Sequence, residues 1–532
     1  MGYAEGGGTE GGQVLTRYDI HDLNNGSVPG YPLKDGWDDI SLYYAKALQN
    51  MGYRDNPPPG DDVETMWKYS EIPNQYYFQA AMHWTPKYQG TPPPPKDQWW
   101  NHCTHESGLT STAETFFLPW HRAFIYWYEV IIRSWVLKLG GPQGWALPYW
   151  NYSYYDPNDP NGPWPRAKLP EAFTRPNLPD RSENPLFIPD REKRGLQPGF
   201  YLQPSTVPDY SEAYSWPVYM GPPPDYSGFN SALDAGPHGP VHVATGAGES
   251  PSSPTGWMRH VHRAAYDPIF WLHHSEIDRF WVGWIHEGHR NPTDDWWLTA
   301  QGDPEYPRRW NFWADGNIQN VIQVVPGQML DPEHLGSQFP YSYKYENLPQ
   351  TAAPRPSGHD LRAVTIPEPA LASGDTQLAA TDETVRIGAD PVTATIPLGD
   401  EAEGALAAVD AAPEKPPLVV LHLRGIASDG PAGNYEVYLN YPDADRDTAA
   451  SVPHYLGMLS GFGADHSHGE GHGEGHGLRR DFNITELVSH LRQVGEWDQS
   501  QATVTIVPVS TDSRELLEAS GMRVGSMSIE TS

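Results

Sequence analysis

Histidine is the residue type whose placement in this chain points most directly to chemistry. Six histidines lie on or beside stretches with the pattern of a buried helix: His83, His105, His121, His238, His242 and His274. His238 and His242 are four residues apart, so both rings can face one side of a helix and share one metal ion. Neutral imidazole is the commonest metal ligand in proteins. The spacing therefore predicts two metal sites, each with three imidazoles.

The ligand type indicates which metal these sites would hold. Neither of the two predicted sites, each with three histidines, includes a carboxylate or a free thiolate as a ligand, which favours copper over magnesium or calcium. Zinc remains open by ligand type, but the chain lacks the HExxH pattern that zinc hydrolases usually show. A noncatalytic copper-binding or storage protein is a further alternative, suggested by the histidine-rich stretch 466–476.

Several helices must position these histidines. Apolar residues recur at helical spacing over 40–51, 76–83 and 115–139, and residues 236–242 lead into a further helix. Another helix, over 267–285, begins at Asp267, which suits an N-cap, and Pro268, which suits the first helical position. Its apolar residues surround the adjacent pair His273 and His274. This helix is therefore expected to be buried, with polar groups that need partners.

Three motifs together resemble those of a known family. They are residues 117–122 (FLPWHR) with Glu129, residues 267–274 (DPIFWLHH) with Asp278 and Arg279, and Cys103-Thr104-His105. They are similar to the two copper signatures and the Cys-x-His element of type-3 copper proteins, the group of tyrosinases, catechol oxidases and molluscan haemocyanins. Arg17 and the segment 341–345 resemble the arginine and Tyr-x-Tyr pair that close the catalytic domain of that family.

The resemblance implies a role for each of these residues. It assigns one copper to His83, His105 and His121, and the other to His238, His242 and His274. It implies a thioether between the sulfur of Cys103 and the ring of His105, and it makes His274, rather than His273, the ligand of the adjacent pair. Four neighbours also receive roles: Phe270 stacks against the site, Val261 is a small gate residue, Asp234 holds a water near the coppers, and Gly239 follows the first ligand of the second copper.

The chain departs from the family pattern in three places. More residues separate His105 from His121 than is usual in the family. Asp234 stands where the family usually has glutamate, so its carboxylate reaches one methylene less far. Gly239 stands where many tyrosinases have asparagine, which removes a helper for taking the proton from a monophenol.

Composition restricts the partners and the compartment. The chain has 532 residues and a formal net charge of -32, so nucleic acid and anionic membranes are poor partners. No apolar run approaches the length of a membrane span. Cys103 is the one cysteine, so no internal disulfide is expected. We expect a soluble bacterial protein, cytoplasmic or secreted with its signal removed; its oligomeric state remains open.

The composition also changes along the chain, which predicts three parts. Residues 1–348 are expected to form a mainly α catalytic domain, a four-helix bundle with long ordered loops around a dicopper site. Residues 349–415 are rich in Ala, Pro and acidic residues and indicate a linker that contains a short strand or two, such as 392–396. Residues 416–532 contain β-type runs that predict a β-sandwich. Residues 433–440 (GNYEVYLN) resemble the KFDV-type C-terminal domain of plant polyphenol oxidases.

The function that the resemblance implies is oxidation of phenols. We expect a copper-dependent oxidase that converts o-diphenols to o-quinones with O₂ and hydroxylates monophenols more slowly. A haemocyanin-like oxygen carrier and an o-aminophenol oxidase are the alternatives. We also expect the full chain to be latent, with an unidentified side chain of residues 416–532 occupying the substrate entrance. The stretch 466–476 is either a metal-attracting tract, whose histidines would deliver copper, or a flexible polar loop.

Overall fold

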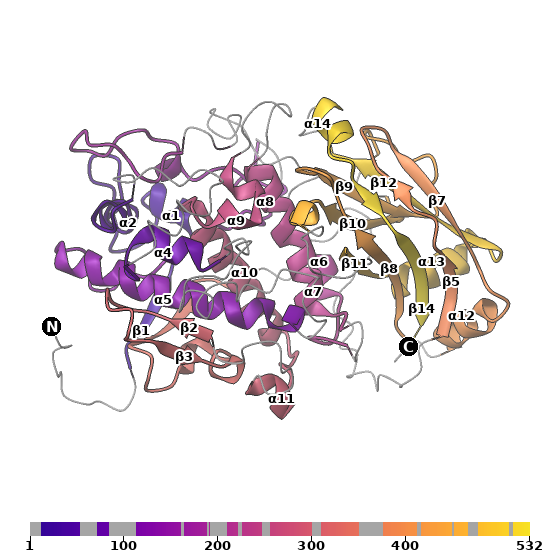
Figure 1. Cartoon of the computed structure of the whole chain (residues 1–532), viewed down its shortest axis with the longest axis horizontal. Coiled ribbons are helices and arrows are strands. Elements are labelled where there is room, and N and C mark those ends of the chain that lie inside the picture. Colours follow the sequence, from indigo (N-terminus) through magenta and orange to yellow (C-terminus); the bar gives the residue numbers. More distant parts are fainter. Residues whose placement is uncertain are drawn as a thin grey trace, which may run out of the picture.

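The structure is a computed structural model of the whole chain (Figure 1). It describes residues 12–53, 72–83, 113–160, 164–188, 191, 210–221, 226–246, 256–299, 310–349, 376–411, 417–448, 452–466, 477–509 and 514–531. Helices dominate up to residue 349, and strands dominate from residue 376 onward.

Two long helices form the centre of the helical part. They are α5 (Phe117–Lys138) and α10 (Ile269–His286), which pack against each other and are buried on most sides. The rings of Tyr128 and Trp271 stack between them, with centroids 3.5 Å apart. Around them lie α1 (Ile20–Asn24), α2 (Asp39–Asn50), α4 (Tyr76–Ala81), α6 (Ser211–Tyr214), α7 (Phe229–Leu233), α8 (Gly239–Thr245), α9 (Val261–Ala264) and α11 (Asp295–Leu298). Shorter turns are η2 (Ala113–Phe116), η3 (Glu171–Phe173), η5 (Asp234–His238), η6 (Trp257–Arg259), η7 (Pro326–Gln328) and η8 (Pro332–His334).

The helices expected from periodicity are present with small shifts at their ends. The helix expected from Asp267 begins at Ile269, and the Asp267 carboxylate accepts a hydrogen bond from the Ile269 N–H at 3.1 Å, as a capping residue does. The helix expected over 115–139 is a 3₁₀ turn followed by α5. The mainly α character of the first part is confirmed.

Short strands close the helical part around a buried arginine. β1 (Val14–Arg17) pairs in parallel with β4 (Ser342–Tyr345), and β2 (Trp310–Phe312) pairs with β3 (Ile322–Val324). The guanidinium of Arg17 lies 2.8 Å from Glu129 and 3.4 Å from Asp278, and it stacks on the ring of Tyr343. Arg122 forms an ion pair with the same Asp278. These charges are almost fully buried, so they tie β1, α5 and α10 together.

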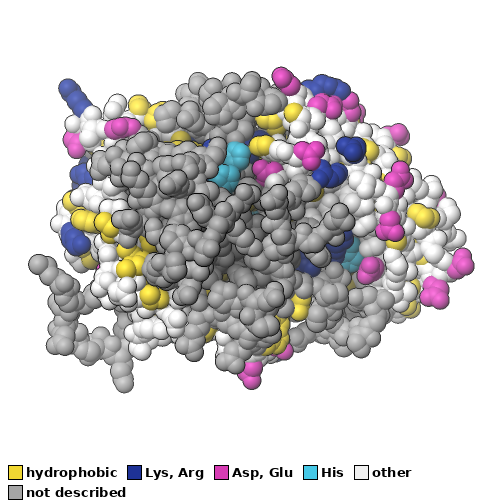
Figure 2. Space-filling model, viewed as in Figure 1, with side chains coloured by type: hydrophobic (Ala, Val, Ile, Leu, Met, Phe, Trp, Pro, Cys, Tyr) yellow, Lys and Arg dark blue, Asp and Glu magenta, His cyan; other side chains and the backbone are white. Residues whose placement is uncertain are grey.

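The C-terminal part is a sandwich of two antiparallel sheets, as expected. One sheet has the order β10-β9-β12-β7 and the other β11-β8-β14-β5, with a common apolar core between them. The strands are β5 (Thr376–Thr381), β6 (Val385–Arg386), β7 (Val392–Pro397), β8 (Val419–Ile426), β9 (Asn434–Leu439), β10 (Tyr455–Ser460), β11 (Leu478–Asn483), β12 (Gln501–Pro508), β13 (Arg523–Val524) and β14 (Ser526–Thr531). The helices of this part are α12 (Ala402–Ala411), α13 (Thr485–Val494), α14 (Arg514–Ala519) and the turn η9 (Ala464–His466). Acidic side chains with basic ones between them are spread over its surface (Figure 2).

The expected linker differs most from the structure. Residues 376–411, which the composition assigned to a linker ending at 415, lie within the sandwich. β5 pairs with β14, and β7 pairs with β12 over Val392–Pro397. The described part of the sandwich therefore begins at Thr376 rather than at 416. Among the described helices, none is both long and apolar enough to cross a membrane.

The ion cluster around Asp278 gives the first prediction. Replacing Asp278→Ala leaves Arg17 and Arg122 buried with less negative charge, which should lower the free energy of unfolding by about 3–5 kcal/mol. Urea unfolding followed by tryptophan fluorescence measures this loss in the helical part, because all the tryptophans except Trp497 precede residue 349.

The matched control is the exposed pair Arg514–Asp390. Arg514→Ala should change stability by less than about 1 kcal/mol, since exposed ion pairs contribute little. An equal, small effect of both substitutions would show that the buried cluster does not fix the helices.

Candidate metal centre

Five of the six predicted histidine ligands meet between the central helices. His121 lies on α5, His274 on α10 and His242 on α8, while His238 ends η5 and His83 follows α4. All five are at most 2% exposed. The sixth, His105, and its expected thioether partner Cys103 lie outside the described residues, so the thioether stays a prediction.

Backbone carbonyls fix the orientation of four of these rings. In each, Nδ1 faces a carbonyl oxygen: His83 with Val261 (2.9 Å), His121 with Phe117 (2.8 Å), His238 with Asp234 (3.0 Å) and His242 with Met258 (2.9 Å). A carbonyl oxygen only accepts hydrogen bonds, so Nδ1 carries the proton. The lone pair is therefore on Nε2, which is the tautomer that a metal ligand needs.

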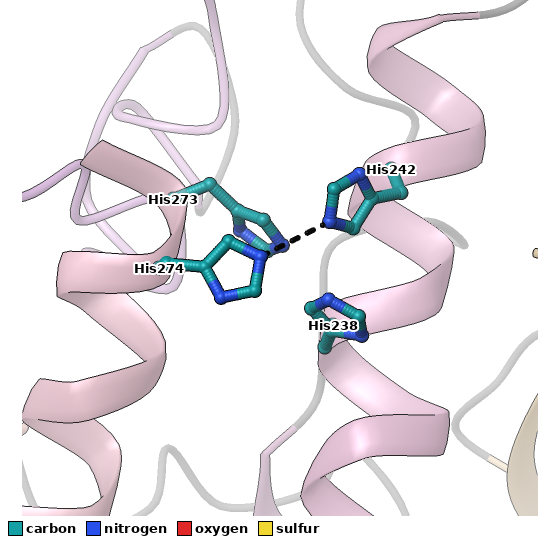
Figure 3. Close-up of side chains that lie close together, drawn as sticks. All are labelled: His238, His242, His273 and His274. Atoms are coloured by element: carbon teal, nitrogen blue, oxygen red, sulfur yellow. Dashed lines mark hydrogen bonds between the residues drawn. The ribbon is translucent and has the colours of Figure 1, made fainter. Parts of the chain in front are cut away.

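The ring nitrogens converge into two groups. One group is His83, His121 and His274, and the other is His238, His242, His273 and His274; within each group the nitrogens lie within 4.8 Å of one another. Figure 3 shows the second group, in which Nε2 of His242 and Nε2 of His274 are 3.4 Å apart. Burial, followed by the neighbouring imidazoles, lowers the pKa of His274 well below its usual value. Neutral, buried imidazoles fit copper.

His273 is a member of the second group, whereas the resemblance gave it no role as a ligand. Its ring is nearly parallel to that of His238, with centroids 5.3 Å apart, and its Nδ1 is 3.0 Å from the hydroxyl of Tyr152. The resemblance made His274 the ligand of the pair, and the geometry keeps His274 as the histidine common to both groups.

The other predicted site residues surround the histidines. The ring of Phe270 lies 4.1 Å from that of His274 and 4.8 Å from that of His83. Val261 is buried and its carbonyl faces His83. A carboxylate oxygen of Asp234 lies 3.0 Å from Nδ1 of His238, so this side chain faces a ligand ring. Gly239 begins α8.

The sequence did not reveal the residue that covers this group. Phe462, from the turn after β10, stacks on the ring of His242 with a centroid distance of 4.1 Å and an interplanar angle of 12°. A cavity of about 80 Å³ remains beside it, lined by Asp234, Gly239 and Val261 from the helical part and by Ser460, Phe462 and Arg480 from the sandwich. The only local signal was a phenylalanine between two glycines, Gly461 and Gly463.

Comparisons with known proteins agree with this geometry. Residues 73–287 match the common central domain of tyrosinase, and residues 375–531 match a domain of unknown function, DUF7868. Tyrosinase HcTyr1 of Hahella sp. (strain CCB-MM4) is 26% identical over 90% of this chain and 94% of its own length. The chloroplastic polyphenol oxidase of Malus domestica is 24% identical over 74% of this chain and 64% of its own length.

Solved structures share the fold. Recombinantly expressed latent aurone synthase, a polyphenol oxidase, superposes with a TM-score of 0.57 at 20% identity, covering 98% of this chain and 89% of its own. Latent apple tyrosinase superposes with a TM-score of 0.55 at 17% identity, covering 98% of each chain. The helical fold and its histidines define a type-3 copper protein. Residues 73–287 carry the central domain of the tyrosinase family, and the cofactor of this domain is a pair of copper ions.

The convergence of the two groups gives the second prediction. His121→Ala and His274→Ala should each leave roughly half or less of the copper bound and no oxidase activity, because each removes a nitrogen donor from at least one of the two groups. Copper per chain is measured by metal analysis after loading and desalting. His289→Ala is the control, since its ring stacks on Trp284 away from the groups. Full copper in both ligand variants would contradict the assignment.

Proposed function

We propose that this copper phenol oxidase converts o-diphenols to o-quinones with O₂ and hydroxylates monophenols more slowly. The observation that supports it is the pair of buried imidazole groups with Nε2 directed inward. When bound, the two coppers supply the reaction with O₂ and take up the electrons of the phenol. The residues proposed as ligands are His83, His105, His121, His238, His242 and His274.

The neighbouring residues determine access and proton transfer in this proposal. Val261 is small, which leaves room for an aromatic ring beside the histidines, and the ring of Phe270 packs against His274 and His83. A monophenol must lose a proton before it can bind as phenolate, which calls for a base. Asp234, with a bound water, is the proposed base. Its carboxylate already faces Nδ1 of His238, and Gly239 has no side-chain amide to place beside it. An o-diphenol depends less on such a base.

An oxygen carrier is the second candidate, and one observation favours it. Phe462 covers His242, so a phenol and this ring cannot occupy the same place. We favour the oxidase because the cover belongs to a separate domain. Formation of coloured quinone from catechol, once the cover is removed, distinguishes the two candidates; an o-aminophenol offered in parallel identifies the other substrate class.

We further propose that the sandwich is a lid that keeps the full chain latent. Besides Phe462, five polar contacts hold it on the helical part; one is the bond from the side chain of Asn483 to the carbonyl of Ser215 (3.1 Å). The side chain of Asn434 donates to the carbonyl of Pro240 (3.0 Å), and Arg259 donates to the carbonyl of Ala432 (2.6 Å). Arg480 pairs with Glu212 (2.8 Å), and Ser227 donates to Asp481 (2.6 Å). The ion pair is buried, so separating the domains must rehydrate both charges.

The third prediction concerns substrate preference. In the enzyme cleaved between residues 349 and 376, catechol oxidation should be clearly faster than hydroxylation of tyrosine, because the monophenol depends more strongly on a base. Gly239→Asn, measured in the same cleaved form, should raise the ratio of the monophenol rate to the diphenol rate. A cleaved wild type that hydroxylates tyrosine as fast as it oxidises dopa would contradict the role given to position 239.

The fourth prediction concerns the lid. Limited proteolysis between residues 349 and 376, or mild detergent, should raise catechol turnover several-fold with the copper content unchanged, because Phe462 then leaves His242. Phe462→Ala should raise the turnover of the uncut chain in the same direction. Equal turnover before and after a clean cut would show that the sandwich does not control access.

A further inference from the structure

Gly239 has a backbone conformation that does not require glycine. Its φ is −56° and its ψ is −48°, which are ordinary values for an α-helix. It is the first residue of α8, between the proposed ligands His238 and His242. Alanine in this conformation favours a helix more than glycine does. One reason for glycine is local, because the ring of Pro240 disfavours this helical conformation in a preceding residue that carries a Cβ.

The second domain supplies a further reason for glycine at this position. A Cβ atom added to Gly239 would lie 2.9 Å from both Cβ and Oγ of Ser460, and 3.6 Å from Cβ of Phe462. Both residues belong to the sandwich, at the end of β10 and in the turn that follows. Cβ of Ser460 cannot rotate away from such a contact, because it is fixed to the strand. A side chain at position 239 and the docked sandwich are thus incompatible without movement of one of them.

Ser460 also connects this contact to the residue that covers the site. Its Oγ accepts a hydrogen bond from the N–H of Phe462 at 3.2 Å, which fixes the turn that presents the ring. The turn has little room to retreat, because a Cβ at Gly461 would lie 2.4 Å from Cβ of Ala432. Ser460 pairs with Asn434 of β9, whose side chain donates to Pro240, the residue after Gly239. Displacing Ser460 should therefore displace Phe462.

We propose that Gly239 is the seat on which the sandwich closes, and that any side chain at this position lifts Phe462 from His242 and opens the copper centre. This inference rests on the proposed latency. It gives position 239 a second role: a substitution there changes access for every phenol, in addition to any effect on monophenols. Gly239→Asn in the uncut chain would then raise both activities.

The test uses two compensating substitutions, at positions 239 and 460, in the copper-loaded full chain. Gly239→Ala adds only the Cβ and should raise catechol turnover several-fold, with little further gain on cleavage between residues 349 and 376. The double variant with Ser460→Gly removes the opposing Cβ and Oγ and should return turnover toward the latent level. Gly404→Ala, at a helical glycine of the sandwich with nothing within 4 Å, is the matched control and should stay latent.

Hydrogen exchange at the turn 460–463 is the second readout, and it does not depend on catalysis. Gly239→Ala should speed exchange there, and the double variant should restore the protection. Ser460→Leu enlarges the same contact from the sandwich side and should also speed exchange at 460–463. It replaces Gly239→Ala in the test where that substitution disturbs folding of the helical part.

The outcomes separate the seat from the proposed oxidase. Faster exchange without any quinone from wild type, cut or uncut, would support the seat and contradict the oxidase. Turnover and exchange of Gly239→Ala that match wild type would overturn the seat. A gain in turnover that Ser460→Gly does not reverse would overturn it too, because the contact would not be its cause.

Discussion

The arrangement of the copper centre depends on one buried cluster of charges. Arg122 follows His121 on α5, and Asp278 lies one turn after His274 on α10, so their ion pair fixes the two helices close to the rings. Arg17 joins the same Asp278 to Glu129, further along α5. Taking these charges out of water is costly. Replacing such a buried cluster with apolar residues of similar volume often leaves a protein equally stable or more stable. The charges instead fix the relative orientation of α5 and α10, since their hydrogen bonds allow few relative positions of the two helices.

A second constraint acts on each ring. Carbonyl groups of η6, α9 and the chain beside the histidines hold Nδ1, so Nε2 points inward before any metal is present. Because the rings are preorganised, binding copper requires little loss of side-chain freedom. The same contacts explain why the short elements around α8 are as important to the site as the long helices.

Sequence reasoning found what depends on local pattern. The periodicity of α4, α5 and α10 and the spacing of His238 and His242, together with the family resemblance that selected His274 over His273, predicted the helices and five histidines of the site. β5 was missed, and β7 was expected only as a short strand within a linker, because their sequences, TQLAAT and VTATIP, contain small and polar residues and lack aromatic ones. Their strand structure comes from pairing with β14 and β12, which are distant in sequence. Phe462 could not be assigned for the same reason: its contact with His242 exists only after two domains have folded.

The covalent connection between the two domains has a consequence for how the enzyme behaves in solution. In the intact chain the proposed lid closes by a unimolecular step, so its effective concentration at the site is set by the connecting segment and not by the amount of protein. Diluting the intact enzyme therefore leaves the fraction of open sites unchanged. After cleavage the same surfaces meet in a bimolecular equilibrium, in which dilution releases the sandwich and high protein concentration restores it. The fraction of open sites, which is independent of protein concentration in the intact chain, thus becomes dependent on it after a single cut.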